Sequence, residues 1–228
     1  TWPTDINNNG MIVGRGQSGD AWYYEISNPG AGIVIIPHLG AATHSDATAV
    51  NDDGTIVGYS GTSPYVSWYY ETGANNPTTT AIPFISGGTW SRAFDINNGG
   101  TVVGIGNDGG NLVAAWYWTD ANGTTDMGLP PNGTDAAAQG INDSGTIVGY
   151  SSMTGGWYWN SGTFTSIGTF PGHDSADPVS INSNGMIVGY SLDALNQRQA
   201  FWWTSADGIN LINPPGADFS EATAVGLK

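Results

Sequence analysis

Apolar and polar positions along the chain repeat a unit of two short strands joined by a tight turn. In each copy an apolar strand ends in Ile-Asn or Val-Asn, the turn closes on Gly, and a second strand ends in Val-Gly. The copies lie at residues 6–14, 50–58, 96–104, 141–149 and 181–189, so they start 40 to 46 residues apart. A period in this range indicates one supersecondary unit that is copied around or along an axis.

The second copy shows what one full unit contains. Its apolar pattern predicts strands at residues 46–51, 55–60, 65–71 and 80–84. Between the first two strands the Asn51 side chain can bond the backbone two residues on, and Gly54 can take the positive φ that closes the turn. Four antiparallel strands in about 44 residues are typical of one blade of a β-propeller.

An aromatic element at the centre of the third strand repeats as regularly as the turn. Its copies are residues 22–24, 68–70, 116–118, 157–159 and 201–203. Alternation along a strand sends the first and third aromatic side chains to one face and the middle one to the other. Both faces then need cover, which blades packed around an axis provide. A linear stack of sheets would need polar caps at its ends, and the sequence shows none.

We therefore predict an all-β fold, a five-bladed β-propeller of four-stranded antiparallel blades with about 44 residues per repeat. Residues 1–228 are expected to form one domain, with repeats at approximately 1–44, 45–90, 91–135, 136–175 and 176–219. In such a ring the middle aromatic residues are shielded from water. These residues are Tyr23, Tyr69, Tyr117, Tyr158 and Trp202.

The C-terminal residues 220–226 match residues 45–51, and so resemble one more first strand. Residues 3–7 already supply that strand for the first turn, which leaves six first strands for five hairpins. We assign closure or assembly to Ala222, Thr223, Ala224 and Val225. Either this strand closes the ring within one molecule, or it pairs with another chain in head-to-tail strand donation, which would build a filament.

The chain is acidic and sparsely charged. Four Lys and Arg stand against nineteen Asp and Glu, for a formal charge of −15. This charge repels nucleic acid and offers no basic patch for phosphate, so we expect no nucleic-acid partner. The longest apolar runs, of about five residues, are too short to span a bilayer, so no membrane insertion is expected.

Other compositional features favour a secreted protein. The sequence has no Cys, which excludes disulfides, thiolate metal sites and a Cys nucleophile. It begins at Thr1 and shows no signal peptide, which we interpret as a processed or trimmed start. The richness in Gly, Asn and Thr with few Lys is typical of a bacterial secreted or cell-surface protein.

The repeat resembles the extracellular HAF-type repeat of bacterial secreted proteins. The resemblance rests on the Ala-x-x-Ile-Asn-x-x-Gly-x-Ile-Val-Gly pattern, seen at residues 47–58 and 93–104, and on the small-residue-aromatic-x-Trp element at 200–203. It covers essentially the whole chain, although the family's His before that element is missing. Asp20, Val66, Ala114, Gly155 and Gln199 stand in its place. The resemblance implies a surface or secreted scaffold and brings no catalytic residue.

Candidate ligand-binding residues fall in the variable loops between repeats. Trp90 lies outside the aromatic element and next to Arg92, so it is either a platform under a sugar ring or a cap on its blade. His44 is followed by Asp46, and His173 by Asp174. Each pair could orient a sugar hydroxyl, or could belong to an ordinary solvated loop.

The sequence bears on three further kinds of site. The Asp- and Asn-rich hairpins lack the six to eight recurring oxygens of a calcium site, so we interpret them as turns. The histidines, His38 included, are placed in loops and are not spaced as zinc ligands. The sequons at Asn122 and Asn132 would be accessible for glycosylation, whereas Asn142 should be occupied with its own backbone.

No nucleophile motif or recurring carboxylate pair appears, so we expect no enzyme and no cofactor. The predicted function is a secreted, acidic, non-catalytic surface or matrix scaffold or recognition protein that could self-assemble through its spare strand. The alternative is a lectin-like propeller with several related glycan sites, which would gain avidity from repetition. A glycoside hydrolase, which needs two carboxylates at a fixed separation, is the remote alternative.

Overall fold

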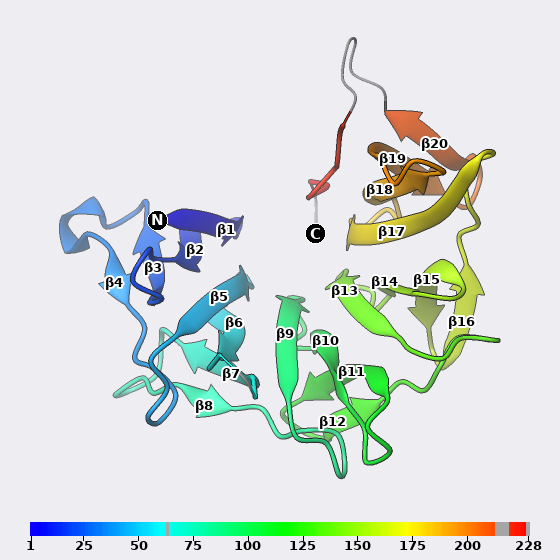
Figure 1. Ribbon diagram of the computed structural model, residues 1–228. Coiled ribbons are helices and arrows are strands. Elements are labelled where there is room, and N and C mark those ends of the chain that lie inside the picture. Colours follow the sequence, from blue (N-terminus) through cyan, green and yellow to red (C-terminus); the bar gives the residue numbers. More distant parts are fainter. Residues whose placement is uncertain (63, 213–218, 227–228) are drawn as a thin grey trace. The chain divides into compact units, whose positions relative to one another are not determined.

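The computed structural model describes residues 1–62, 64–212 and 219–226 and contains five four-stranded antiparallel sheets (Figure 1). Each sheet is built from four consecutive strands in chain order. The first contains β1 (Trp2–Ile6), β2 (Met11–Arg15), β3 (Ala21–Glu25) and β4 (Val34–Ile35). The second contains β5 (Ser45–Val50), β6 (Thr55–Ser60), β7 (Val66–Glu71) and β8 (Thr80–Ala81).

The remaining three sheets follow the same order. The third contains β9 (Ser91–Ile96), β10 (Val102–Asn107), β11 (Val113–Thr119) and β12 (Gly123–Asp126). The fourth contains β13 (Ala137–Ile141), β14 (Ile147–Ser151), β15 (Gly155–Asn160) and β16 (Thr163–Ser166). The fifth contains β17 (His173–Ile181), β18 (Ile187–Asp193), β19 (Arg198–Thr204) and β20 (Gly208–Ile212).

The chain divides into two compact units. The first unit comprises residues 1–111 and 116–126, and the second comprises residues 112–115 and 127–228. Besides the strands, the described residues include one three-residue 3₁₀ turn, η1 (Pro29–Ala31). The described part of the chain holds no helix with the length and apolar character needed to cross a membrane.

The repeated turn forms, although the Asn51 side chain bonds the backbone four residues on and not two residues on as predicted. The Asn51 side-chain oxygen accepts a hydrogen bond from the Thr55 backbone N–H at 2.9 Å, and Gly54 has a φ of +81°. The Asn side chain also links neighbouring sheets, since its Nδ2 donates to the carbonyl of the equivalent Asn in the next sheet. These bonds are Asn7 to Asn51 (2.8 Å) and Asn51 to Asn97 (3.4 Å) in the first unit, and Asn142 to Asn182 (3.0 Å) in the second.

The Gly at the end of the repeated Val-Gly pair lets the first two strands approach closely. A Cβ added to Gly58 would lie 2.0 Å from the carbonyl oxygen of Asp46 and 2.7 Å from the Trp68 ring. Each first strand also carries a β-bulge opposite this point, between Ala47 and Ala49 in the second sheet. The bulged Thr48 hydroxyl lies 3.2 Å from the Val57 carbonyl and 3.1 Å from the Ala93 carbonyl of the next sheet. The sequence Val-Gly is therefore a packing requirement of the repeat.

The core lies between successive sheets of each unit, where the aromatic elements meet. Trp68, Trp116, Trp157 and Phe201 are fully buried, and Trp22 is 5% exposed. The middle aromatic of one sheet contacts the third aromatic of the next sheet. Ring centroids are 6.3 Å apart for Tyr23–Tyr70, 5.2 Å for Tyr69–Trp118 and 5.5 Å for Tyr158–Trp203. All five middle aromatics are half-buried, so the prediction that they are shielded from water holds in part.

Two predicted boundaries were wrong. The fourth strand of the second sheet, β8, has two residues instead of five, since Ile82 continues the chain with a single backbone bond to Ser67. The fifth repeat begins at His173, three residues before the predicted boundary, because β17 is nine residues long and pairs with β18 from His173 onward. The loop predicted around His173 is therefore the start of a strand.

Candidate functional site

A pocket of about 250 Å³ opens where the second and third sheets of the first unit meet. Its lining residues are Thr55, Tyr69, Glu71, Ile96, Gly100, Trp118 and Asp120. We call it the junction pocket. Tyr69 and Trp118 stack with centroids 5.2 Å apart and an interplanar angle of 27°. The pocket therefore combines two aromatic rings with two carboxylates.

Repeat positions explain why these residues meet. Tyr69 is the middle aromatic of β7, and Trp118 is the third aromatic of β11, so alternation turns them toward the same space between the sheets. Glu71 ends β7 and Asp120 follows β11, which places both carboxylates at the same end of the pocket as the repeated turns. Thr55, the first residue of β6, supplies a hydroxyl.

The corresponding space between the first and second sheets is filled. Met11 stands where Thr55 stands one repeat later, and it is buried. A Cβ added to Gly54 would meet the Thr72 hydroxyl at 2.5 Å and the Met11 Cε at 3.6 Å, whereas one added to Gly100 would meet nothing within 4 Å. At the junction pocket the smaller Thr55 stands in the place that Met11 occupies at the first junction.

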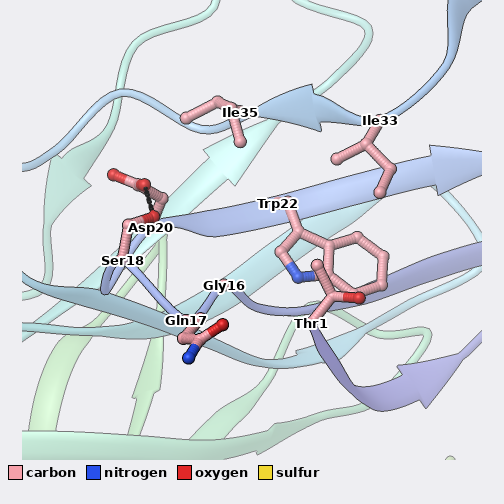
Figure 2. Close-up of a pocket in the computed structure, with 8 residues that line it drawn as sticks. All are labelled: Thr1, Gly16, Gln17, Ser18, Asp20, Trp22, Ile33 and Ile35. Atoms are coloured by element: carbon pink, nitrogen blue, oxygen red, sulfur yellow. Dashed lines mark hydrogen bonds between the residues drawn. The ribbon is translucent and has the colours of Figure 1, made fainter.

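A second, more open pocket of about 570 Å³ lies on the first sheet (Figure 2). Trp22, Ile33 and Ile35 form its apolar part, and Gln17, Ser18 and Asp20 from the loop between β2 and β3 supply polar groups. The Ser18 hydroxyl donates to Asp20, and this bond is the main reason why the pKa of Asp20 lies below its usual value. The pocket carries one carboxylate, against two in the junction pocket.

Solved structures of known proteins share this architecture. TolB from Acinetobacter baumannii superposes with a TM-score of 0.67 at 14% identity, over 98% of this chain and 56% of that one. AofleA from Arthrobotrys oligospora superposes with a TM-score of 0.55 at 11% identity, over 91% of this chain and 68% of that one. The Aleuria aurantia lectin, in complex with Fucα1-6GlcNAc, superposes with a TM-score of 0.52 at 14% identity, over 95% of this chain and 80% of that one. The chain is a five-bladed β-propeller.

These likenesses show the fold, and its five sheets are the blades. The chain spans 56% of the length of TolB, so it corresponds to part of that protein. No protein-family model matches the sequence, and no curated protein sequence matches it.

The predicted pairing of His44 with Asp46 is present, but its carboxylate is buried. His44 Nε2 lies 3.4 Å from Asp46 Oδ1, and Arg15 Nη1 lies 3.7 Å from Asp46 Oδ2, with Asp46 4% exposed. Burial, followed by the hydrogen bond with Asp46, raises the pKa of Tyr59 to about 12. The cluster therefore joins blades one and two, and its carboxylate faces the protein interior.

Trp90 and Arg92, predicted as neighbouring ligand-binding candidates, make separate contacts. The Arg92 guanidinium lies 3.6 Å from the centroid of the Tyr65 ring and 5.2 Å from that of Tyr59, so it is stacked between blades. The backbone of Trp90 is fixed by Asn107, whose Oδ1 accepts its N–H at 3.0 Å. Trp90 is half-buried, and it stays a candidate without the help of Arg92.

The predicted pairing of His173 with Asp174 is replaced by another contact. His173 Nδ1 lies 2.9 Å from the Ser191 hydroxyl, and its ring meets Phe170 edge-on, while Asp174 is exposed. The third histidine, His38, has its Nε2 3.0 Å from Asp20 Oδ1. The pairing of β17 with β18 shifts register between His173 and Ser175, which is where Asp174 lies.

Other candidates can be placed as well. Asn122 and Asn132 are exposed, whereas the Asn142 side chain accepts the Thr146 N–H at 2.9 Å, as predicted. The Asp- and Asn-rich hairpins are turns of this kind. Across residues 1–62, 64–212 and 219–226, no three His, Asp or Glu side chains gather so that they could hold a metal ion.

The indole N–H groups of the buried tryptophans are a repeated structural feature. Those of Trp22, Trp68, Trp116 and Trp157 find no acceptor among the described residues. The fifth blade carries Phe201 at this position, which has no such donor. The indole N–H is therefore dispensable to the blade, and the aromatic volume is what the position requires.

The sequence missed the junction pocket. The predicted ligand-binding residues include none that line this pocket. The available signal was the exchange of Met11 for Thr55 at one repeat position, together with the acids Glu71 and Asp120 just beyond the aromatic elements. This signal becomes interpretable only when the two repeats are known to face each other.

Proposed function

We propose that this chain is a secreted, non-catalytic recognition protein that binds a saccharide in the junction pocket. The observation that carries the proposal is the stacked Tyr69–Trp118 pair with Glu71 and Asp120 lining the same pocket. Carboxylates accept hydrogen bonds from hydroxyl groups, and aromatic rings offer apolar surface to the C–H face of a sugar. A volume of about 250 Å³ fits one sugar ring, at the small end of ligand pockets.

The fold and the composition support this proposal. The Aleuria aurantia lectin shows that a propeller of this kind can hold a fucosylated ligand. Secretion is proposed from the Gly-, Asn- and Thr-rich composition and from the resemblance to HAF-type repeats. The alternative role is a surface or matrix scaffold without a small ligand, which requires no pocket.

Glycoside hydrolysis is the competing reaction, because Glu71 and Asp120 are two carboxylates in one pocket. Both side chains are exposed. A general acid is usually kept protonated at neutral pH by an apolar, sheltered environment, which an exposed rim does not provide. We therefore assign the two carboxylates to binding.

The test is a glycan array followed by titration of the saccharide that binds best. Thr55→Met should fill the junction pocket as Met11 fills the first junction, and should weaken binding at least tenfold. Trp90→Ala is the matched control, since it removes the loop platform and leaves the junction pocket intact. Loss of binding in Trp90→Ala alone would move the site to the loop.

Two further results would overturn the proposal. Wild-type protein that binds no saccharide on a broad array supports the scaffold role. Release of reducing sugar from a bound oligosaccharide, abolished by Glu71→Gln or Asp120→Asn, would make the protein a glycosidase.

A further inference from the structure

The junction pocket holds two negative charges and no positive one. Its lining includes Glu71 and Asp120 and contains no Lys, Arg or His. Both acidic side chains are exposed, and exposed carboxyl groups are ionised at neutral pH. Two like charges that border one small space repel each other, and a cation that binds beside them relieves this repulsion. The pocket therefore has the charge of a site for a positively charged group.

The arginines of the described residues make their contacts elsewhere. Arg15 and Arg198 pair with acids outside the pocket, at N–O distances of 3.7 and 2.7 Å, and the Arg92 guanidinium lies 3.6 Å from the centroid of a tyrosine ring. Within residues 1–62, 64–212 and 219–226, no ion pair includes Glu71 or Asp120. The charge of the two pocket carboxylates is therefore available to a ligand.

The two acids are not part of the repeated pattern of a blade junction. Between the fourth and fifth blades the aromatic pair recurs, with ring centroids 5.5 Å apart. There the neutral residues Asn160 and Ser205 stand where the junction pocket has Glu71 and Asp120. Between the first and second blades one of the two places holds an acid, Glu25. The packing of blades therefore does not require the pair of carboxylates.

The aromatic pair of the pocket suits a cation as well as a sugar ring. Tyr69 and Trp118 stack with their centroids 5.2 Å apart. The face of a Trp or Tyr ring attracts an ammonium group that lies within about 6 Å of its centre. The same rings offer apolar surface to the C–H face of a sugar. A sugar that carries a charged amine can therefore use the rings and the carboxylates together.

The size of the pocket and the charge of the chain favour a small, cationic sugar. A volume of about 250 Å³ holds one sugar ring, and a hexosamine carries its amino group directly on that ring. The formal charge of −15 attracts cations toward the protein. An anionic sugar, such as a uronic acid, is repelled by both the pocket and the chain.

On the basis of the proposed saccharide binding, on which this inference rests, we propose that the ligand of the junction pocket is an amino sugar with a free, positively charged amino group. The ammonium group pairs with Glu71 and Asp120, and the C–H face of the sugar lies on the rings of Tyr69 and Trp118. N-acetylation removes the positive charge, so the acetylated sugar binds more weakly. A uronic acid binds more weakly still.

Calorimetric titration with methyl glycosides that differ only at C2 tests this inference. The probes are the methyl glycosides of glucosamine and galactosamine, compared with those of glucose and galactose. At about pH 6 the carboxyl groups are ionised and the amine is charged. We expect one amino form to bind about tenfold more tightly than its hydroxyl form, since it gains ion pairs and a cation–π contact. High salt should reduce the difference, because it screens exposed charges.

Two double variants show which charges are responsible. Glu71→Gln combined with Asp120→Asn keeps the shape of both side chains, and should remove the preference for the amino form. Asp143→Asn combined with Asp174→Asn is the matched control, because it removes the same charge from exposed positions of the second unit, and it should keep the preference. Circular dichroism checks that all variants fold.

Three results would overturn the inference. Equal affinity for the amino and hydroxyl forms would do so and would leave saccharide binding standing, as would binding of a saccharide on the array but of none of the four glycosides. A preference that survives in Glu71→Gln with Asp120→Asn would assign the attraction to the charge of the whole chain. Absence of saccharide binding both on the array and in the titrations would overturn the proposed function together with this inference.

Discussion

The first and second blades carry the same tryptophan in two different environments. Trp68 of the second blade is fully buried beneath Val13, Ala21 and Ile36 of the first. Trp22 of the first blade is backed by its own sheet, and its other side borders the open pocket of Figure 2. The repeat is the same, and the two tryptophans differ in what lies against their rings.

This difference shows that a blade is not a self-sufficient unit. Its apolar face is completed by the neighbouring blade, as in other repeat proteins, where each unit contacts its neighbours. The two blade junctions of the first unit differ in a similar way. Met11 occupies the space between the first and second blades, whereas the smaller Thr55 lines the junction pocket between the second and third blades.

Replacing Trp68 or Trp22 by Ala is expected to have the largest effect on the free energy of unfolding. Trp68→Ala should lower the free energy of unfolding by about 4 kcal/mol, as for large buried side chains. Trp22→Ala should cost somewhat less, about 3 kcal/mol, since its ring is 5% exposed and borders the open pocket. Urea unfolding followed by circular dichroism measures both. Equal losses would mean that the open pocket does not weaken the packing of Trp22.

The close-approach glycines give a second contrast. Gly58→Ala forces a Cβ to within 2.0 Å of the Asp46 carbonyl, in a strand packed between blades, and should cost about 3 kcal/mol. Gly14→Ala meets the Trp2 carbonyl at 2.2 Å, but exposed β1 can move away, so about 1 kcal/mol is expected. Thermal unfolding compares them, and a Gly14→Ala loss as large as that of Gly58→Ala would show that β1 is held firmly.

Opening the filled junction sharpens the comparison of the two pockets. Met11→Thr should cost about 1–3 kcal/mol, since it removes buried apolar volume, and should create a counterpart of the junction pocket. Calorimetric titration with the bound saccharide should then show one more site per chain. Met153→Thr, at an exposed methionine, is the control and should change neither quantity. An unchanged number of binding sites would mean that exchanging Met for Thr at this position does not create a saccharide site.

The smallest expected effects on stability are electrostatic. The first concerns Asp177 in β17, the first strand of the fifth blade. Burial raises the pKa of Asp177, although the Tyr190 hydrogen bond and Arg198 oppose the rise. Its folded state therefore holds the proton more tightly than the unfolded state, and it loses stability as the pH rises above the ordinary value of 3.8. Asp177→Asn should be more stable than wild type at pH 7, and the gain should vanish toward pH 3 in melting curves.

Asp135, in the same unit, has a lowered pKa, so its effect on stability has the opposite dependence on pH. Its burial would raise its pKa, but hydrogen bonds from Ser152 and Ser151 lower it overall. The stabilisation is present above the ordinary carboxyl pKa and is lost as the pH falls through the lowered value. Asp135→Asn should thus destabilise the protein at pH 7, and a gain in stability there would contradict the assignment.

The local chemistry of the repeat made much of the architecture predictable. The Asn at the turn, the Gly with positive φ and the alternating aromatic residues act over a few neighbouring residues, so their spacing reveals the strands and the five blades. The strand β6 was predicted at its observed bounds. The short β8 was overestimated because strand length at a blade's outer edge depends on pairing with β7 and not on local pattern.

The candidate sites were less predictable, for a physical reason. Asp46 and Arg92 are charged residues near loops, which suggested solvent-exposed binding groups, yet the neighbouring blade buries one and stacks the other on Tyr65. The junction pocket depends on residues from two repeats that face each other. Residues from Thr55 to Asp120 line this pocket, and their wide separation in the sequence gives no indication that they lie together.

By itself, the sequence determined the period, the turns, the strands and the aromatic core, because these depend on alternation and on backbone geometry within one repeat. The tertiary structure alone decided which aromatic face is covered, which junction is open, and where the C-terminal segment lies, with the Ser220 N–H bonded to the Arg198 carbonyl of the fifth blade. Those outcomes depend on packing between blades, in which one side chain, such as Met11, either fills a shared space or leaves it open.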